Sequence, residues 1–278
     1  MKILFIGIIT EEVLAATKSD ELIGSFVDIG EAAREVGNIC NAYNAIDTFT
    51  WQMIPIDDAH CPRDEEVESF IQHYKSATSQ KYDRIITRFA CELGHPKRNQ
   101  ETPLGNLIAD ILRDSFGIDL MLMGSGAIRS YSLGPVVHYA DLVECLPYDD
   151  AVYMLKVTGA QLERMLRHVL RDEAFQGEHT EFYQFSHGMH IVWSRSTQTF
   201  RTLTLDGEVL YAHRLYTVAM QKYHYNNLKA FLNITLEEAE ENGKIRVLST
   251  SARDVVEEYL MVNQHLNRRV EGRLVVED

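Results

Sequence analysis

Hydrophobic and polar positions follow two periods along this chain, and together they predict a mixed α/β fold. Residues 2–9 form an apolar run typical of a buried strand. Residues 29–44 place apolar side chains at three- and four-residue steps, as an amphipathic helix does. Residues 48–56 return to strand-like alternation, and the turn-rich residues 57–64 indicate a boundary.

After this boundary, the charged residues 65–81 carry a single apolar stripe, which predicts a connecting helix. A strand over 85–91, a helix over 103–116 with proline in its first turn and a strand over 119–123 follow. We expect further helices over 140–145, 160–171, 236–241 and 253–266, and strands over 151–157, 189–194, 199–205, 215–221 and 273–276. Asp206-Gly207 predicts a hairpin.

The expected architecture is therefore a mixed sheet with flanking helices in residues 84–278. Residues 57–83 connect it to a small strand-helix segment in residues 1–56. That segment lacks sheet neighbours, so we expect its apolar faces to be exposed and to favour self-association.

Composition limits the partners that the chain can have. Its 278 residues, 45% of them hydrophobic, can bury a full core. The formal net charge of −14 argues against duplex nucleic acid as a partner. No apolar stretch reaches the roughly 20 residues of a membrane span, so we expect no membrane contact. The apolar run that follows Lys2 ends before Glu11 and Glu12, which favours a buried strand over a signal peptide. The sequence therefore does not indicate the cellular compartment.

The sequence offers no recognisable metal site or catalytic group. No CxxC pair occurs among the four cysteines, which are Cys40, Cys61, Cys91 and Cys145. This spacing favours ordinary free thiols, and the alternative is two disulfide bonds. Ser125 lies between two glycines, but the spacing is not that of a nucleophile elbow. We therefore expect neither catalytic residues nor metal ligands, and no cofactor, in this chain.

Candidate binding residues gather around a glycine turn. Gly124 and Gly126 directly follow a predicted strand, so the backbone around Ser125 can present N–H groups to an oxygen-rich ligand. Arg129 lies just beyond the turn, and we expect both it and Arg98 to be buried there.

Two aromatic segments accompany the turn. Tyr148 follows Leu146-Pro147, and its ring offers a flat face on which a base can stack. Tyr223 opens a segment that ends with Asn226 and Asn227, just beyond a predicted strand, where ligand sites of α/β folds collect. The alternative is a tyrosine-rich loop that packs on itself.

Four ordered motifs resemble the C-terminal domain of the 5'-nucleotidases over roughly residues 84–276. They are Glu101-Thr-Pro-Leu-Gly-Asn-Leu107, Gly124-Ser-Gly-Ala-Ile-Arg129, Leu146-Pro-Tyr148 and Val157-Thr-Gly-Ala-Gln-Leu162. The resemblance implies that this domain binds a nucleotide or nucleoside. It implies Tyr148 and Tyr223 as the two rings that sandwich the base, and Arg98 and Arg129 as anion contacts.

Two departures from the family pattern concern this site. Gly124 stands where the family has the asparagine that opens the turn, and Asn227-Leu228-Lys229 replaces a Gly-Gly-Asp whose aspartate reaches the ribose hydroxyls. Asn226 or Asn227 is a candidate replacement for that ribose contact.

The resemblance also implies a missing catalytic half. In the family, a metallophosphoesterase domain with Asp-x-His, Gly-Asn-His-Asp/Glu and Gly-His-x-His motifs holds two divalent metals that activate water. None of these motifs occurs here, and residues 1–56 resemble a remnant of that domain. Family members are often exported.

Three hypotheses follow. The first is a nucleotide-binding domain of a 5'-nucleotidase-like phosphoric monoester hydrolase that is inactive alone. The second is a binding module or gene fragment without turnover, and the third is a metal-independent hydrolase that uses Ser125.

Overall fold

The computed structural model describes residues 34, 38, 64–175 and 181–277. Arg34 and Asn38 are helical, as expected for residues 29–44, and the rest of that helix lies outside the described residues. So do the strands expected over 2–9 and 48–56, together with Cys40 and Cys61. Residues Phe70–Asp278 form one unit, which contains every candidate site residue.

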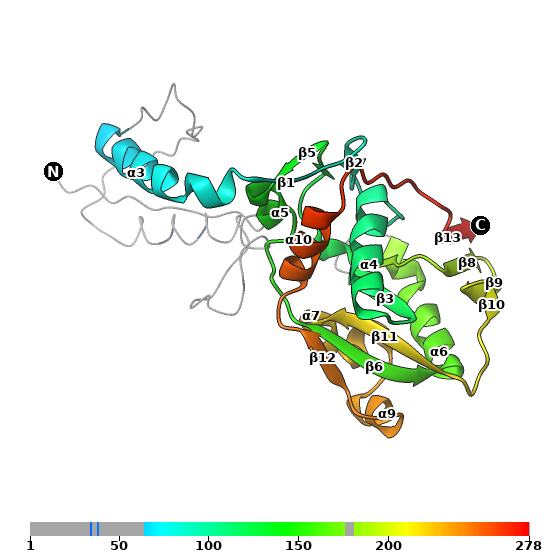
Figure 1. Ribbon diagram of the computed structural model, residues 1–278. Helices are drawn as coiled ribbons and strands as arrows, with labels where there is room; N and C mark the ends of the chain where they lie inside the picture. The colour runs from blue at the N-terminus through cyan, green and yellow to red at the C-terminus, as the bar shows by residue number, and fades with distance from the viewer. Residues whose placement is uncertain (1–33, 35–37, 39–63, 176–180, 278) are drawn as a thin grey trace. The chain divides into compact units, whose positions relative to one another are not determined.

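Strands and helices alternate around two larger sheets (Figure 1). Within residues 64–175 and 181–277, the α-helices are α3 (Glu65–Tyr82), α4 (Pro103–Phe116), α5 (Tyr139–Cys145), α6 (Gly159–Val169), α7 (Lys222–Asn226), α8 (Leu228–Leu232), α9 (Leu236–Glu241) and α10 (Ala252–Val262). The 3-10 helices in the same ranges are η2 (Ser125–Ala127) and η3 (Asp172–Phe175).

The central sheet has five strands in the order β12-β6-β11-β3-β7. They are β12 (Arg246–Ser249), β6 (Val152–Thr158), β11 (Leu215–Gln221), β3 (Leu120–Gly124) and β7 (Tyr183–Phe185). Strands β11 and β3 run parallel, and the other neighbours run antiparallel. The sheet is therefore mixed, as the sequence predicts.

A four-stranded sheet and two ribbons make up the rest of the β-structure in the described residues. The four-stranded sheet has the order β10-β9-β8-β13 and contains β10 (Glu208–Val209), β9 (Thr199–Leu205), β8 (Met189–Ser194) and β13 (Leu274–Glu277). The ribbons pair β1 (Ile85–Arg88) with β5 (Val136–His138), and β2 (Leu93–Gly94) with β4 (Ser132–Leu133). The Asp206-Gly207 hairpin is confirmed between β9 and β10.

Both faces of the central sheet are covered. Met121 and Met123 of β3 pack into a cluster with α4 and α10, whereas Leu120 and Leu122 pack into a second cluster with α6. This alternation follows from the two-residue period of a strand. Helix α10 contacts α4, so the first face is a helix pair on a sheet (Figure 1).

Helix α4 matches its predicted bounds because both ends carry strong local signals. The Thr102 hydroxyl caps the first turn by accepting a hydrogen bond from Gly105 N–H, and Pro103 needs no donor there. Gly117 ends the helix in the left-handed conformation, with φ of 62°.

Helix α10 ends at Val262 rather than at the predicted residue 266. The following residues turn away and form hydrogen bonds with β1 and with the residues just after it. The hydroxyl of Thr87 donates to the carbonyl of Asn263 at 2.9 Å, and Ala90 N–H donates to the carbonyl of Leu266 at 2.9 Å. The predicted strand over 85–91 is likewise shortened to Ile85–Arg88.

No helix in the described ranges is both long and apolar enough to cross a membrane.

Candidate functional site

The candidate site is built around the turn that ends β3. Strand β3 stops at Gly124, and η2 turns the chain toward Arg129. The backbone of Gly124 is ordinary, with φ of −59°, so its glycine is explained by packing. A β-carbon there would overlap Nε2 of His224 and lie 3.2 Å from Oε1 of Glu181.

Ser125, at the centre of the turn, is completely buried and held from two sides. The amide of Gln184 donates to its hydroxyl at 3.0 Å, and the Nε2 of His95 lies 3.1 Å from its carbonyl. The Nδ1 of His95 pairs with the hydroxyl of Thr102 at 2.8 Å, which ties the turn to the start of α4.

This arrangement does not support the hydrolase hypothesis for Ser125. Its hydroxyl lies 3.4 Å from Nε2 of His95, but the other ring nitrogen meets a threonine instead of a carboxylate. Burial, opposed by the bond to Ser125 and assisted by Arg98, lowers the pKa of His95. The serine has no exposed surface through which to reach a substrate.

The N–H groups of the turn are engaged within the chain, contrary to expectation. Ser125 N–H donates to the carbonyl of Phe182 at 2.8 Å, and Gly126 N–H donates to Oε1 of Glu181 at 3.4 Å. The space beside the glycines therefore holds protein atoms. A β-carbon on Gly126 would lie 3.5 Å from Glu181 Oε1 and 3.9 Å from Arg98 Nη1.

The two arginines are placed differently from the expectation that both are buried. Arg98 is exposed, and Arg129 is half-buried. Arg129 makes a long hydrogen bond of 3.5 Å to the carbonyl of Gly126, and its guanidinium carbon lies 5.9 Å from the ring centroid of half-buried Tyr148. Arg98 and Arg129 thus both approach Gly126, and Tyr148 accompanies Arg129.

Tyr223 reaches the turn through its neighbour His224. Tyr223 is 53% exposed, and its ring lies 5.4 Å from the ring of His224, whose Nε2 faces Gly124. The Nδ1 of His224 pairs with the hydroxyl of Tyr183 at 3.0 Å. Burial lowers the pKa of His224 to about 4, and burial together with Glu181 raises that of Tyr183, so both groups are neutral at pH 7.

The alternative of a tyrosine-rich loop at 223–227 does not describe the backbone, because Lys222–Asn226 form a short helix, α7. Asn226 is exposed on it. The amide of Asn227 donates to the carbonyl of Tyr223 at 2.8 Å, within its own helical turn.

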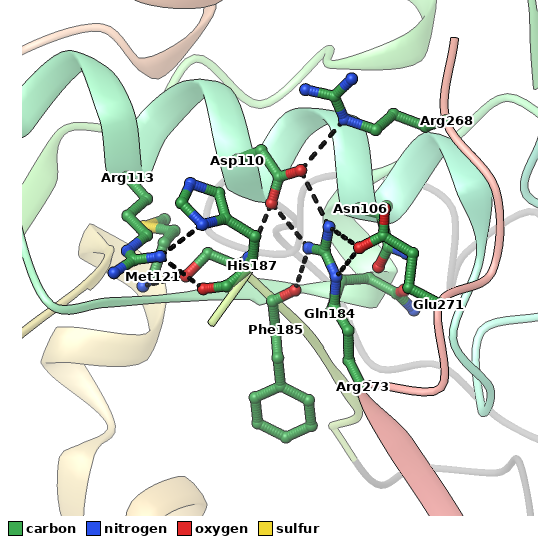
Figure 2. A network of polar contacts seen from close by, with 12 residues as sticks. Asn106, Asp110, Arg113, Met121, Gln184, Phe185, His187, Arg268, Glu271 and Arg273 are labelled. Atoms are coloured by element: carbon green, nitrogen blue, oxygen red, sulfur yellow. Dashed lines mark hydrogen bonds and ion pairs between the residues drawn. The ribbon is translucent and has the colours of Figure 1, made fainter. Parts of the chain in front are cut away.

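Strand β7 carries Tyr183 and Gln184, two of the residues that sequence analysis missed, and a buried charge network fixes this strand. Asp110 of α4 accepts two hydrogen bonds from Arg273, at 2.6 and 2.9 Å, and one from the backbone N–H of His187 at 2.7 Å. Arg273 also donates to the carbonyl of Phe185 at 2.8 Å. Figure 2 shows Asp110 between Arg268 and Arg273, above the strand. The network thereby holds the strand from which Gln184 reaches Ser125.

A separate cavity of about 460 Å³ contains none of the predicted site residues. It is lined by Tyr153, Tyr225, Glu240, Lys244 and Ile245. The two tyrosine rings stack directly on each other, with centroids 4.2 Å apart, and leave no gap between them for a base.

The described residues do not fit a dinuclear metal centre. Within residues 64–175 and 181–277, no group of three or more His, Cys, Asp or Glu side chains could hold a metal ion. Cys91 and Cys145, the two described cysteines, are both free thiols.

Comparisons of both sequence and fold relate this chain to known proteins. Residues 80–234 match the model of the 5'-nucleotidase C-terminal domain, and the chain belongs to this family. Over 117 residues, 41% of the chain, it is 25% identical to endonuclease YhcR of Bacillus subtilis (strain 168) and covers 10% of that protein.

Solved structures share the fold. A 5'-nucleotidase precursor from Thermus thermophilus has a TM-score of 0.63 and 19% identity, over 78% of this chain and 44% of that one. The NAD nucleotidase of Haemophilus influenzae has a TM-score of 0.54 and 13% identity, over 92% of this chain and 47% of that one. This chain therefore spans about a tenth of that curated relative and less than half of each of these two structures.

Proposed function

We propose that residues 84–278 bind a nucleoside or nucleotide as the substrate-binding domain of a 5'-nucleotidase-like phosphohydrolase. Family membership supports this proposal, and the observation that carries it is the arrangement around one turn. Arg98 and Arg129 approach Gly126, Tyr148 accompanies Arg129, and Tyr223 reaches Gly124 through His224.

In this proposal, the rings of Tyr148 and Tyr223 supply stacking surfaces for the base. Stacking on an aromatic ring contributes on the order of 1 to 3 kcal/mol per base. Neither ring is fully covered by protein, so both have surface to offer. The guanidinium groups of Arg98 and Arg129 supply donors for the sugar-phosphate part of the ligand.

Calorimetric titration with adenosine and AMP tests binding. We expect the Tyr148→Ala variant to bind each ligand about tenfold more weakly, from the loss of one stacking surface. Tyr211→Ala, which removes a tyrosine that is 55% exposed and belongs to none of the contacts above, is the matched control. Absence of binding at millimolar ligand, or equal affinities for the Tyr148→Ala variant and the parent, would refute the proposal.

We also propose that the chain has no phosphohydrolase activity on its own. The motifs that hold the two metals in the family are absent from the sequence. A phosphate-release assay with AMP and Mn²⁺, Zn²⁺ or Co²⁺ tests this point. Metal-dependent turnover that co-purifies with the chain at constant specific activity would contradict it.

A further inference from the structure

The carboxylate of Glu181 takes the space that the two glycines of the turn leave open. Its Oε1 lies 3.2 Å from the position of a β-carbon on Gly124 and 3.5 Å from that of one on Gly126. The same oxygen accepts the long hydrogen bond from Gly126 N–H. The glycines therefore make room for a negatively charged side chain of the protein itself, at the place where sequence analysis expects an anionic ligand.

The electrostatics at this place oppose a phosphate group. An incoming phosphate at Arg98 would lie beside the Glu181 carboxylate, because both head groups flank the same face of Gly126. The turn offers it little in return, since the N–H groups of Ser125 and Gly126 already have acceptors. Two like charges a few ångströms apart at a partly exposed site repel each other.

An uncharged ligand that carries hydrogen-bond donors gains from the same arrangement. An ionised carboxylate only accepts hydrogen bonds, so it favours hydroxyl and amino groups. Among the described residues, the groups near the Glu181 carboxylate are Arg98, which attracts it, and Tyr183 and His224, which are both neutral at pH 7. Burial raises the pKa of Glu181, and the bond from Gly126 and the charge of Arg98 oppose that rise.

We infer that Glu181 is a specificity-determining residue that makes the turn select the nucleoside part of a ligand, through its hydroxyl or amino groups, and reject phosphate. The inference rests on the proposed function. It narrows the role of Arg98 and Arg129 from the sugar-phosphate part to the sugar hydroxyls: the turn takes the uncharged end of the ligand, and any phosphate lies away from Gly126.

The test compares adenosine, AMP and inorganic phosphate by calorimetry at pH 8, where the phosphate of AMP is fully ionised. The parent should bind adenosine at least as tightly as AMP. In Glu181→Gln, which keeps the shape of the side chain and removes its charge, the affinity ratio of AMP to adenosine should rise about tenfold, and competition by inorganic phosphate should strengthen. Glu181→Ala should shift the ratio in the same direction.

Glu258→Gln is the matched control, because it removes one charge from an exposed residue of α10. It should leave the ratio unchanged. With 2',3'-dideoxyadenosine and inosine, the parent should discriminate against at least one analogue, which identifies the hydroxyl or the amino group as the partner, and Glu181→Gln should lose that discrimination.

A ratio that changes by less than threefold in Glu181→Gln, or a parent that binds AMP tenfold more tightly than adenosine, would overturn this inference and leave the proposed function standing. A parent that discriminates against neither analogue would also overturn it. Failure of the parent to bind either adenosine or AMP would end the proposed function, and this inference with it.

Discussion

The buried ion pair between Asp110 and Arg273 should contribute strongly to the stability of the fold that positions the site. The Asp110 side chain is 3% exposed and that of Arg273 is 4% exposed. The pair is bidentate, and Asp110 also accepts from Arg268 at 3.1 Å and from the backbone of His187. Asp110→Ala would leave the buried Arg273 guanidinium with the half-exposed carboxylate of Glu271, 2.7 Å away, as its remaining counter-charge.

The expected magnitude follows from burial. Removing one partner of a buried ion pair costs about 3 to 5 kcal/mol. Arg273 keeps its contact with Glu271, whose side chain is 41% exposed, so we expect the lower end of this range. The backbone N–H of His187 would lose its acceptor as well, which costs about 1 kcal/mol or more. Since domains are stable by only about 5 to 15 kcal/mol, Asp110→Ala should remove a large part of the free energy of unfolding.

Urea unfolding followed by circular dichroism measures this effect. A double-mutant cycle of Asp110→Ala, Arg273→Met and the variant with both changes removes the two charges singly and together. The double variant should recover at least half of the loss, giving a coupling energy of about 2 kcal/mol or more. Glu208→Ala breaks the exposed pair with Arg214 and should change stability by less than about 0.5 kcal/mol. A loss below about 1 kcal/mol in Asp110→Ala, or a coupling energy near zero, would refute the reasoning.

Three further predictions concern the turn itself. Gly124→Ala should lower stability by about 1 to 3 kcal/mol in the same urea assay and weaken adenosine binding, because its methyl group overlaps the His224 ring, and an unchanged variant would contradict this packing. His224 binds a proton below pH 6.5 when unfolded but only below about pH 4 when folded, so the free energy of unfolding should fall by about 3 kcal/mol as pH drops through this window. A pH series of urea melts should show a flatter profile for His224→Met, and equal profiles would argue against a buried neutral ring. Thr102→Ala should lower stability by about 1 to 2 kcal/mol through the lost cap and the lost partner of His95, with Thr102→Ser near the parent in thermal unfolding.

Local signals made much of the fold predictable. The bounds of α4, β8, β9 and β11 agree with the sequence analysis, because capping residues, alternation and turn residues all lie within a few positions of each element. The end of α10 could not be predicted in this way. It depends on hydrogen bonds to residues near β1 that lie more than 170 positions away in the sequence.

The site was predictable only in part for the same reason. The glycine turn and Arg129 belong to one short motif, so their proximity follows from the sequence. Glu181, Gln184 and His224 come from other elements, and no local pattern marks them as neighbours of the turn. The exposure of Arg98 likewise depends on how a loop lies on the finished fold.

The family match ends at residue 234, but the folding unit continues beyond it. Strand β12 pairs with β6 at the edge of the central sheet, α10 covers α4, and Arg273 neutralises Asp110. A recombinant fragment cut at the boundary of the match would carry a bare sheet edge, an uncovered apolar helix face and an unpaired interior carboxylate. Such a fragment should aggregate, and expression work on this domain should retain every residue through 277.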